Sequence, residues 1–169
     1  MTCRWVTLSL VWYIGLSLLG CIVDSRKTIP SLPIMLGAEQ ISVRSVEQLE
    51  VRAKVALANN RRVFTYFLGT RDPRTNQSWC PDCRAAEPTV LKGLKVTNES
   101  DLFIWCEVGD RDEWIIPENP FKKHHVLRLK EIPTLVSLAS HDGIIDVKSR
   151  LIGNDCKKVR MVEEFFVQG

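Results

Sequence analysis

Residues Ser78-Trp79-Cys80-Pro81-Asp82-Cys83 form the stretch that decides the fold of this 169-residue chain. Cysteines three positions apart lie on one face of a helix, so their sulfur atoms can form a disulfide with little backbone movement. Pro81 favours a helix that starts at this point, because the first helical turn does not need the N–H that proline lacks. The stretch therefore predicts a helix that begins near Cys80 and carries a redox-active pair of cysteines.

The two cysteines are expected to play different catalytic roles. A thiolate at a helix N-terminus is stabilised by unpaired backbone N–H groups and by the helix dipole, which lower the pKa of Cys80. Cys80 is therefore the predicted nucleophile, open to solvent. The more shielded Cys83 is the predicted resolving residue, which attacks the mixed disulfide that Cys80 forms. Asp82 opposes the effect of the helix, since its negative charge repels a neighbouring thiolate and raises the pKa of Cys80.

Three neighbours of the cysteines are candidates for supporting roles. Glu87 lies four residues beyond Cys83 on the same side of the helix and is a candidate proton acceptor, although a simply exposed glutamate is the plainer interpretation. Trp79 could contact substrates, although a tryptophan between a loop and a helix more often packs against the protein. Pro81 supports the site by shaping the first helical turn.

The sequence Ile132-Pro133-Thr134 is the second element of interest. A cis bond before Pro133 would present the backbone of Ile132 to an extended substrate by strand-like pairing, and would hinder the two cysteines from sharing a metal. Because most X-Pro bonds are trans, position alone favours an ordinary trans proline at the start of a strand.

Strands and helices are predicted to alternate along the rest of the chain. Capping signals and helical spacing of apolar residues indicate the helices, and runs of β-branched and aromatic residues indicate the strands. The predicted helices cover residues 45–59, 80–95, 121–127 and 156–167, and the predicted strands cover residues 63–68, 102–108, 134–139 and 144–148. An Asp-Gly pair is predicted to turn the last two strands into a hairpin. This order predicts an α/β protein in which helices cover both faces of a sheet, a three-layer α/β/α sandwich.

Residues 1–34 are interpreted as a signal-like hydrophobic segment followed by a linker. Arg4 precedes an uncharged apolar run over residues 5–23, the layout of a secretory signal. The run is also long enough for an uncleaved membrane anchor. Met35 directly precedes the predicted domain, so translation from Met35 would give residues 35–169 without an export signal.

Composition disfavours two classes of ligand. The chain has 23 Lys and Arg against 20 Asp and Glu, a net charge of +3, which is too small for the clustered basic face that nucleic acid needs. Zinc is disfavoured because no second cysteine pair exists and the three histidines are not spaced as its ligands. No metal is therefore predicted. Cys106 is expected to be a buried free thiol, and Cys156 is expected to be the same or partly exposed.

The chain resembles the thioredoxin superfamily, and within it a branch of thioredoxin-related disulfide reductases. The similarity extends over residues 35–169. It is carried by residues 78–83, Ala86-Glu87-Pro88, Gly93-Leu94, Trp114, Pro117, Asn119, Phe121, Lys123 and the motif Ile132-Pro133-Thr134-Leu135.

The resemblance implies a thioredoxin fold with a central mixed β-sheet, a cis Pro133, and a monomeric cytosolic protein-disulfide reductase. Such an enzyme binds no cofactor. It uses a Cys80–Cys83 disulfide, reduces small or accessible disulfides, and draws electrons from NADPH through thioredoxin reductase. The loop Thr70–Ser78 is longer than in ordinary thioredoxins and is expected to narrow the range of protein substrates.

Two alternatives stay open at this point. If residues 1–34 direct export, the same chemistry would belong to a thiol oxidoreductase or isomerase of the secretory pathway, and a membrane would be a partner only if residues 5–23 stay as an anchor. The fold could also serve as a non-catalytic binding module. The intact pair of Cys80 and Cys83 counts against that reading.

Overall fold

The computed structural model of the chain describes residues 37–169. The signal-like segment and linker predicted for residues 1–34 lie outside these residues. Five strands form one sheet in the order β1-β3-β2-β4-β5. They are β1 (Glu39–Val43), β2 (Val63–Leu68), β3 (Leu102–Glu107), β4 (Thr134–His141) and β5 (Ile144–Ile152). The sheet is mixed, because β1, β3 and β2 are parallel whereas β4 and β5 each run antiparallel to their neighbour.

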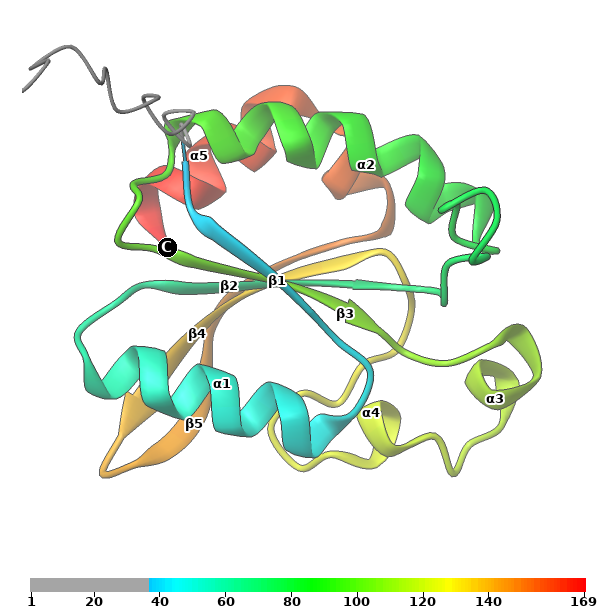
Figure 1. Cartoon of the computed structure of the whole chain (residues 1–169), viewed down its shortest axis with the longest axis horizontal. Helices are drawn as coiled ribbons and strands as arrows, with labels where there is room; N and C mark the ends of the chain where they lie inside the picture. The colour runs from blue at the N-terminus through cyan, green and yellow to red at the C-terminus, as the bar shows by residue number, and fades with distance from the viewer. Residues whose placement is uncertain (1–36) are drawn as a thin grey trace, which may run out of the picture. The chain divides into compact units, whose positions relative to one another are not determined.

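Helices cover both faces of this sheet. Helix α1 (Val46–Ala58) lies against one face, and α2 (Pro81–Gly93) and α5 (Val159–Gln168) lie against the other (Figure 1). The shorter helices are α3 (Arg111–Ile115) and α4 (Pro120–Lys123), with 3-10 turns η1 (Leu94–Val96) and η2 (Gly153–Lys157). The predicted three-layer α/β/α architecture is thus confirmed.

Strand β2 joins the two hydrophobic cores. All six of its residues are buried, and successive side chains of a strand point to opposite faces. Val63 and Phe67 enter the core beneath α1, whereas Phe64 and Tyr66 enter the core beneath α2 and α5. A strand that is buried on both faces has a nearly continuous run of apolar residues, and this run is why β2 could be predicted from the sequence.

The N-terminus of α1 follows its sequence signal closely. The Ser45 side chain accepts a hydrogen bond from the Gln48 N–H at 3.2 Å. Gln48 in turn accepts one from the Arg44 N–H at 2.9 Å. The first bond satisfies a backbone donor that the first helical turn leaves free, and the second satisfies the N–H of the residue before the cap.

Several element predictions need correction. Strand β1 was missed because it is a five-residue edge strand with only Val43 buried, so it lacks the apolar run of a central strand. The helix predicted over residues 121–127 ends at Lys123, because His124 leaves the helical conformation and its ring nitrogen accepts bonds from two later backbone N–H groups. Helix α3 was not predicted. The last predicted helix is divided into η2 and α5.

The β4–β5 hairpin has the predicted turn. Asp142 and Gly143 both adopt positive φ angles, 52° and 77°, as a tight two-residue hairpin turn requires. Both strands extend further than expected, and β5 reaches Ile152. Within residues 37–169, no helix is long and apolar enough to cross a membrane.

Candidate active site

Cys80 is the N-cap residue of α2, at the end of the sheet where β2 and β3 finish. Its sulfur accepts a hydrogen bond from the Cys83 backbone N–H at 3.2 Å. Its own N–H donates to the Ser78 hydroxyl at 3.2 Å, and that hydroxyl donates to the Gly69 carbonyl at 2.7 Å. The loop before α2 and the first helical turn together fix the position of the sulfur atom.

The two cysteines face one another as free thiols. The pKa of Cys80 is lowered from 9.0 to about 7, first by a hydrogen bond from the Cys83 thiol and then by the backbone N–H groups of Cys83 and Asp82, which together outweigh burial. The pKa of Cys83 is raised, because its proton is held on the Cys80 sulfur and because the residue is buried. The geometry therefore makes Cys80 the thiolate and keeps Cys83 protonated.

Cys80 is less exposed than expected from the sequence. Only 5% of the residue is accessible to solvent, and Cys83 is fully buried. The reason is that the Cys80 sulfur turns back over the first turn of α2 and lies 3.9 Å from the Ile132 carbonyl oxygen on the opposite loop. The Cys80 sulfur therefore lies between the first turn of α2 and the loop of Ile132 and Pro133.

The loop opposite Cys80 contains a cis bond between Ile132 and Pro133. Ile132 is half-buried and packs against both hydrophobic cores, while its carbonyl faces Cys80. The structure thus places the Ile132-Pro133-Thr134 motif against the cysteine motif, although the two are about fifty residues apart in the sequence.

Trp79 is held by the protein itself. Its indole N–H donates to the Gly109 carbonyl at 2.9 Å, and its ring lies so close to Gly69 that a Cβ there would come within 2.6 Å of the ring nitrogen. Trp79 is half-buried and contacts both cores. Packing therefore accounts for this residue, and its remaining exposed part is what a substrate could touch.

Asp82 and Pro81 are both exposed in the first turn of α2. The sign predicted for Asp82 is confirmed, since its charge raises the pKa of Cys80 and of Cys83. The Asp82 carboxylate also forms an ion pair with Lys157 of η2, at 2.6 Å. The sequence gave no indication of this contact, because the two residues are 75 positions apart.

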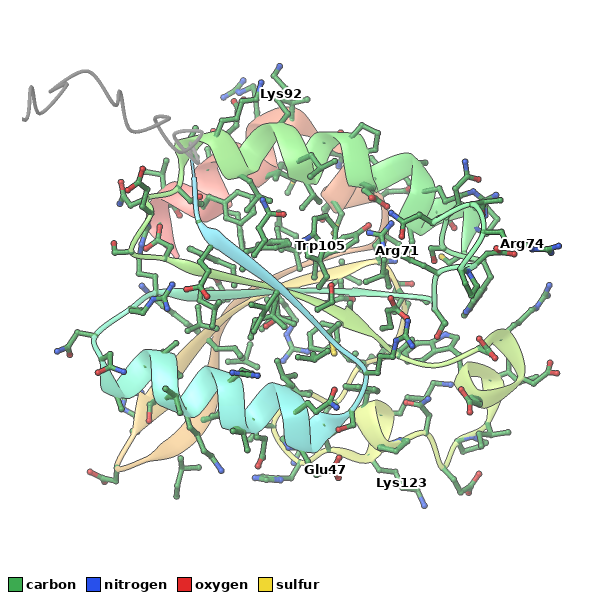
Figure 2. All side chains as sticks on the ribbon, in the orientation of Figure 1. Glu47, Arg71, Arg74, Lys92, Trp105 and Lys123 are labelled. Atoms are coloured by element: carbon green, nitrogen blue, oxygen red, sulfur yellow. The ribbon has the colours of Figure 1, made fainter. Side chains whose placement is uncertain are left out.

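Glu87, the candidate proton acceptor, is engaged elsewhere. Its carboxylate pairs with Arg71 at 3.0 Å, and the Arg71 guanidinium lies over the Trp105 ring, 5.2 Å from the centroid (Figure 2). Glu87 and Arg71 line a polar pocket that also includes Glu107. The structure thus gives Glu87 a structural partner, and its role as a proton acceptor for Cys83 stays a prediction.

Sequence reasoning missed three residues that hold the site together. The buried Tyr66 hydroxyl donates to the Cys83 carbonyl at 3.0 Å. Arg84 donates to the Ser78 carbonyl at 2.7 Å. Ser78 was noted only as part of the motif, yet it is fully buried and links two backbone groups. The Tyr66 contact has no local sequence signal, whereas Ser78 lies two residues before Cys80 and Arg84 lies one helical turn after it.

The other two described cysteines are buried, as expected. Burial raises the pKa of Cys106 well above its ordinary value, and raises that of Cys156 to about 12. The Cys156 thiol donates to the Leu151 carbonyl at 3.4 Å. Both residues therefore stay protonated near neutral pH. Residues 37–169 contain no group of three or more histidine, cysteine or acidic side chains arranged to hold a metal.

The sheet order, a cysteine pair at the start of α2 and a cis-proline loop against it define a thioredoxin-like domain. In agreement, the structure is similar to that of thioredoxin NaTrxh from Nicotiana alata, with a TM-score of 0.52 over 78% of this chain and 93% of that one. Sequence identity in that comparison is 17%, so the similarity concerns the fold.

The chain belongs to the thioredoxin domain-containing protein 17-like family, whose thioredoxin domain matches residues 42–168. It is 35% identical to human thioredoxin domain-containing protein 17 over 132 residues, which cover 78% of this chain and 98% of the human protein. It is 42% identical to the thioredoxin-like protein Clot of Arabidopsis thaliana over 73 residues, 43% of this chain and 54% of that protein. Family and fold together support a role of the thiol-disulfide oxidoreductase type.

Proposed function

We propose that this protein is a disulfide reductase that acts on small or accessible disulfides. The observation that carries the proposal is the asymmetry of the cysteine pair. Cys80 caps α2 and its sulfur accepts a hydrogen bond from the Cys83 N–H, so its pKa is lowered to about 7, whereas the pKa of the fully buried Cys83 is raised. A thiolate nucleophile next to a protonated resolving thiol is the arrangement that two-step disulfide exchange requires.

The reaction transfers two electrons from the cysteine pair to the substrate. The Cys80 thiolate attacks one sulfur of the substrate disulfide, which forms a mixed disulfide and releases the first substrate thiolate. Cys83 then loses its proton and attacks the Cys80 sulfur, which forms the Cys80–Cys83 disulfide and releases the second substrate thiolate. The substrate ends as two thiols and the protein ends oxidised, so an external reductant must restore the pair.

We assign that reductant to NADPH acting through thioredoxin reductase, with no cofactor bound to the chain itself. The low exposure of Cys80 favours substrates whose disulfide is itself accessible, such as cystine or an extended peptide segment. Such a segment would lie along the loop of Ile132 and Pro133, where the Ile132 backbone faces the sulfur. We further propose that the protein acts as a monomer.

The test is a coupled assay with the full chain, NADPH, thioredoxin reductase and cystine. NADPH oxidation should depend on the chain and should be lost in Cys80→Ser. The matched control is Cys106→Ser, which removes a buried thiol outside the site and should keep the activity. If the wild-type chain does not oxidise NADPH in this assay, the reductase proposal is wrong and a binding module is favoured.

The cellular location of the protein stays a prediction. Translation from Met35 would place the domain in the cytosol together with thioredoxin reductase, and an operating export signal in residues 1–34 would place it in the secretory pathway. The N-terminal peptide of the native protein, identified by mass spectrometry, distinguishes a start at Met35 from a start near Arg26.

A further inference from the structure

The 3-10 turn η2 connects the two halves of the redox site. Its first residue, Gly153, donates its N–H to the Pro133 carbonyl at 2.8 Å. Its last residue, Lys157, accepts a hydrogen bond at its carbonyl from the Thr89 hydroxyl of α2, at 3.4 Å. The turn therefore touches both the cis-proline loop and the helix that carries the cysteines.

The Lys157 side chain extends from this turn to the cysteine motif. Its ammonium group lies 2.6 Å from a carboxylate oxygen of Asp82. A second hydrogen bond, to the Asn154 side-chain oxygen at 3.0 Å, holds the same ammonium group from its own turn. Lys157 is 29% exposed and Asp82 is 67% exposed. The Asn154 contact restrains the ammonium group, so Lys157 loses less freedom on pairing with Asp82 than a free surface lysine would.

Asp82 is the residue whose charge needs an opposing group. It lies between the two cysteines, and its carboxylate disfavours a thiolate at either of them. A cation paired with that carboxylate weakens the repulsion between Asp82 and the thiolate.

We propose that Lys157 is a positioning residue of the redox site, which holds the Asp82 carboxylate in an ion pair and offsets the negative charge that Asp82 places beside the Cys80 thiolate. The inference rests on the proposed reductase function, because it concerns the nucleophile of that reaction.

The other charged groups around the site do not pair with Asp82. On η2, Asp155 pairs with Lys158 at 2.8 Å. On α2, Arg84 donates to the carbonyls of residues 78 and 79. Glu131, in the loop before the cis bond, is exposed. Among the described residues, Lys157 is the cation that pairs with Asp82.

Two further titratable groups pack against the cysteines. They are Tyr66 of β2 and Cys156 of η2, and both have raised pKa values because they are buried. They stay neutral in the range where Cys80 titrates, so they do not replace the charge of Lys157.

The experiment measures how Cys80 reacts with iodoacetamide as a function of pH in the full, reduced chain. Mass spectrometry of the peptide that contains Cys80, with fragmentation to separate it from Cys83, follows this sulfur alone. Lys157→Gln should move the midpoint of the profile upward by about 0.3 pH units, a twofold fall in the ratio of thiolate to thiol. A small shift of this order is expected when one charge is lost from a partly solvated site.

Three further variants separate the ion pair from a general structural effect. Lys157→Arg keeps the charge and should keep the midpoint of the wild type. Lys158→Gln removes a neighbouring lysine that pairs with Asp155 and should also leave the midpoint in place. In an Asp82→Asn background, Lys157→Gln should have less than half the effect that it has in the wild type.

The proposal is overturned if Lys157→Gln leaves the midpoint unchanged, if Lys158→Gln moves it equally, or if Lys157→Gln acts equally with and without Asp82. The alkylation profile needs no disulfide turnover. A shifted midpoint in a chain that fails the NADPH assay would therefore refute the proposed function and leave the ion-pair inference standing.

Discussion

Replacing Cys83 with alanine tests the contact that most strongly sets the chemistry of Cys80. The hydrogen bond from the Cys83 thiol is the largest cause of the lowered pKa of Cys80, about 7 instead of 9.0. Cys83→Ala removes this donor, and leaves in place the backbone N–H of residue 83, which donates to the Cys80 sulfur at 3.2 Å. The Cys80 thiolate thus loses the thiol donor but is still stabilised by the N-terminus of α2.

The expected size of the effect follows from the energy of a hydrogen bond to a charged group. Such bonds contribute about 1.5 to 3 kcal/mol, and each 1.36 kcal/mol corresponds to a tenfold change in an ionisation equilibrium. The pKa of about 7 places the wild-type midpoint near neutral pH. We expect Cys83→Ala to move the alkylation midpoint upward by about one pH unit or more, a tenfold or larger fall in the ratio of thiolate to thiol.

The assay is the pH profile of iodoacetamide alkylation at Cys80, read from the peptide that contains it. The midpoint is the readout, because a more basic thiolate is also more nucleophilic and partly hides the change at any single pH. Cys83→Ser is the matched variant, since its hydroxyl can still donate, and its midpoint should lie nearer to the wild type. Profiles of Cys83→Ala and wild type that coincide would refute the assignment of this hydrogen bond.

Three other outcomes are expected. Cys83→Ser should accumulate mixed disulfides between Cys80 and substrate, visible as reductant-sensitive adducts on gels, and a failure to trap any adduct would contradict the two roles. Tyr66→Phe should lower the free energy of unfolding by about 1 to 2 kcal/mol in urea, because the buried bond from the Tyr66 hydroxyl to the Cys83 carbonyl is lost; an unchanged urea midpoint would show that this bond adds nothing. Gly69→Ala should destabilise the fold by about 1 to 3 kcal/mol, since its new methyl group would collide with the Trp79 ring. Equal urea midpoints for Gly69→Ala and wild type would contradict that packing.

The features that follow a local physical rule were predicted well. The continuous apolar run of β2 is one such feature, and the Ser45 cap of α1 and the Asp142-Gly143 turn are others, since each depends on residues within a few positions. The start of α2 at Cys80 belongs with them, because Pro81 and the spacing to Cys83 are local signals. Strand β1 was missed for the opposite reason: its place at the edge of the sheet comes from pairing with β3, about sixty residues later.

The sequence by itself determined the kind of chemistry, because two sulfur atoms one helical turn apart at a helix N-terminus can form a disulfide and share a proton wherever that helix lies. Only the tertiary structure decided how that chemistry is tuned and reached. The Ile132 carbonyl beside Cys80, the Tyr66 hydroxyl on Cys83 and the Lys157 ammonium on Asp82 are all brought in from other elements of the fold. Contacts of this kind leave no periodic or local pattern in a sequence, because each depends on where two distant segments pack.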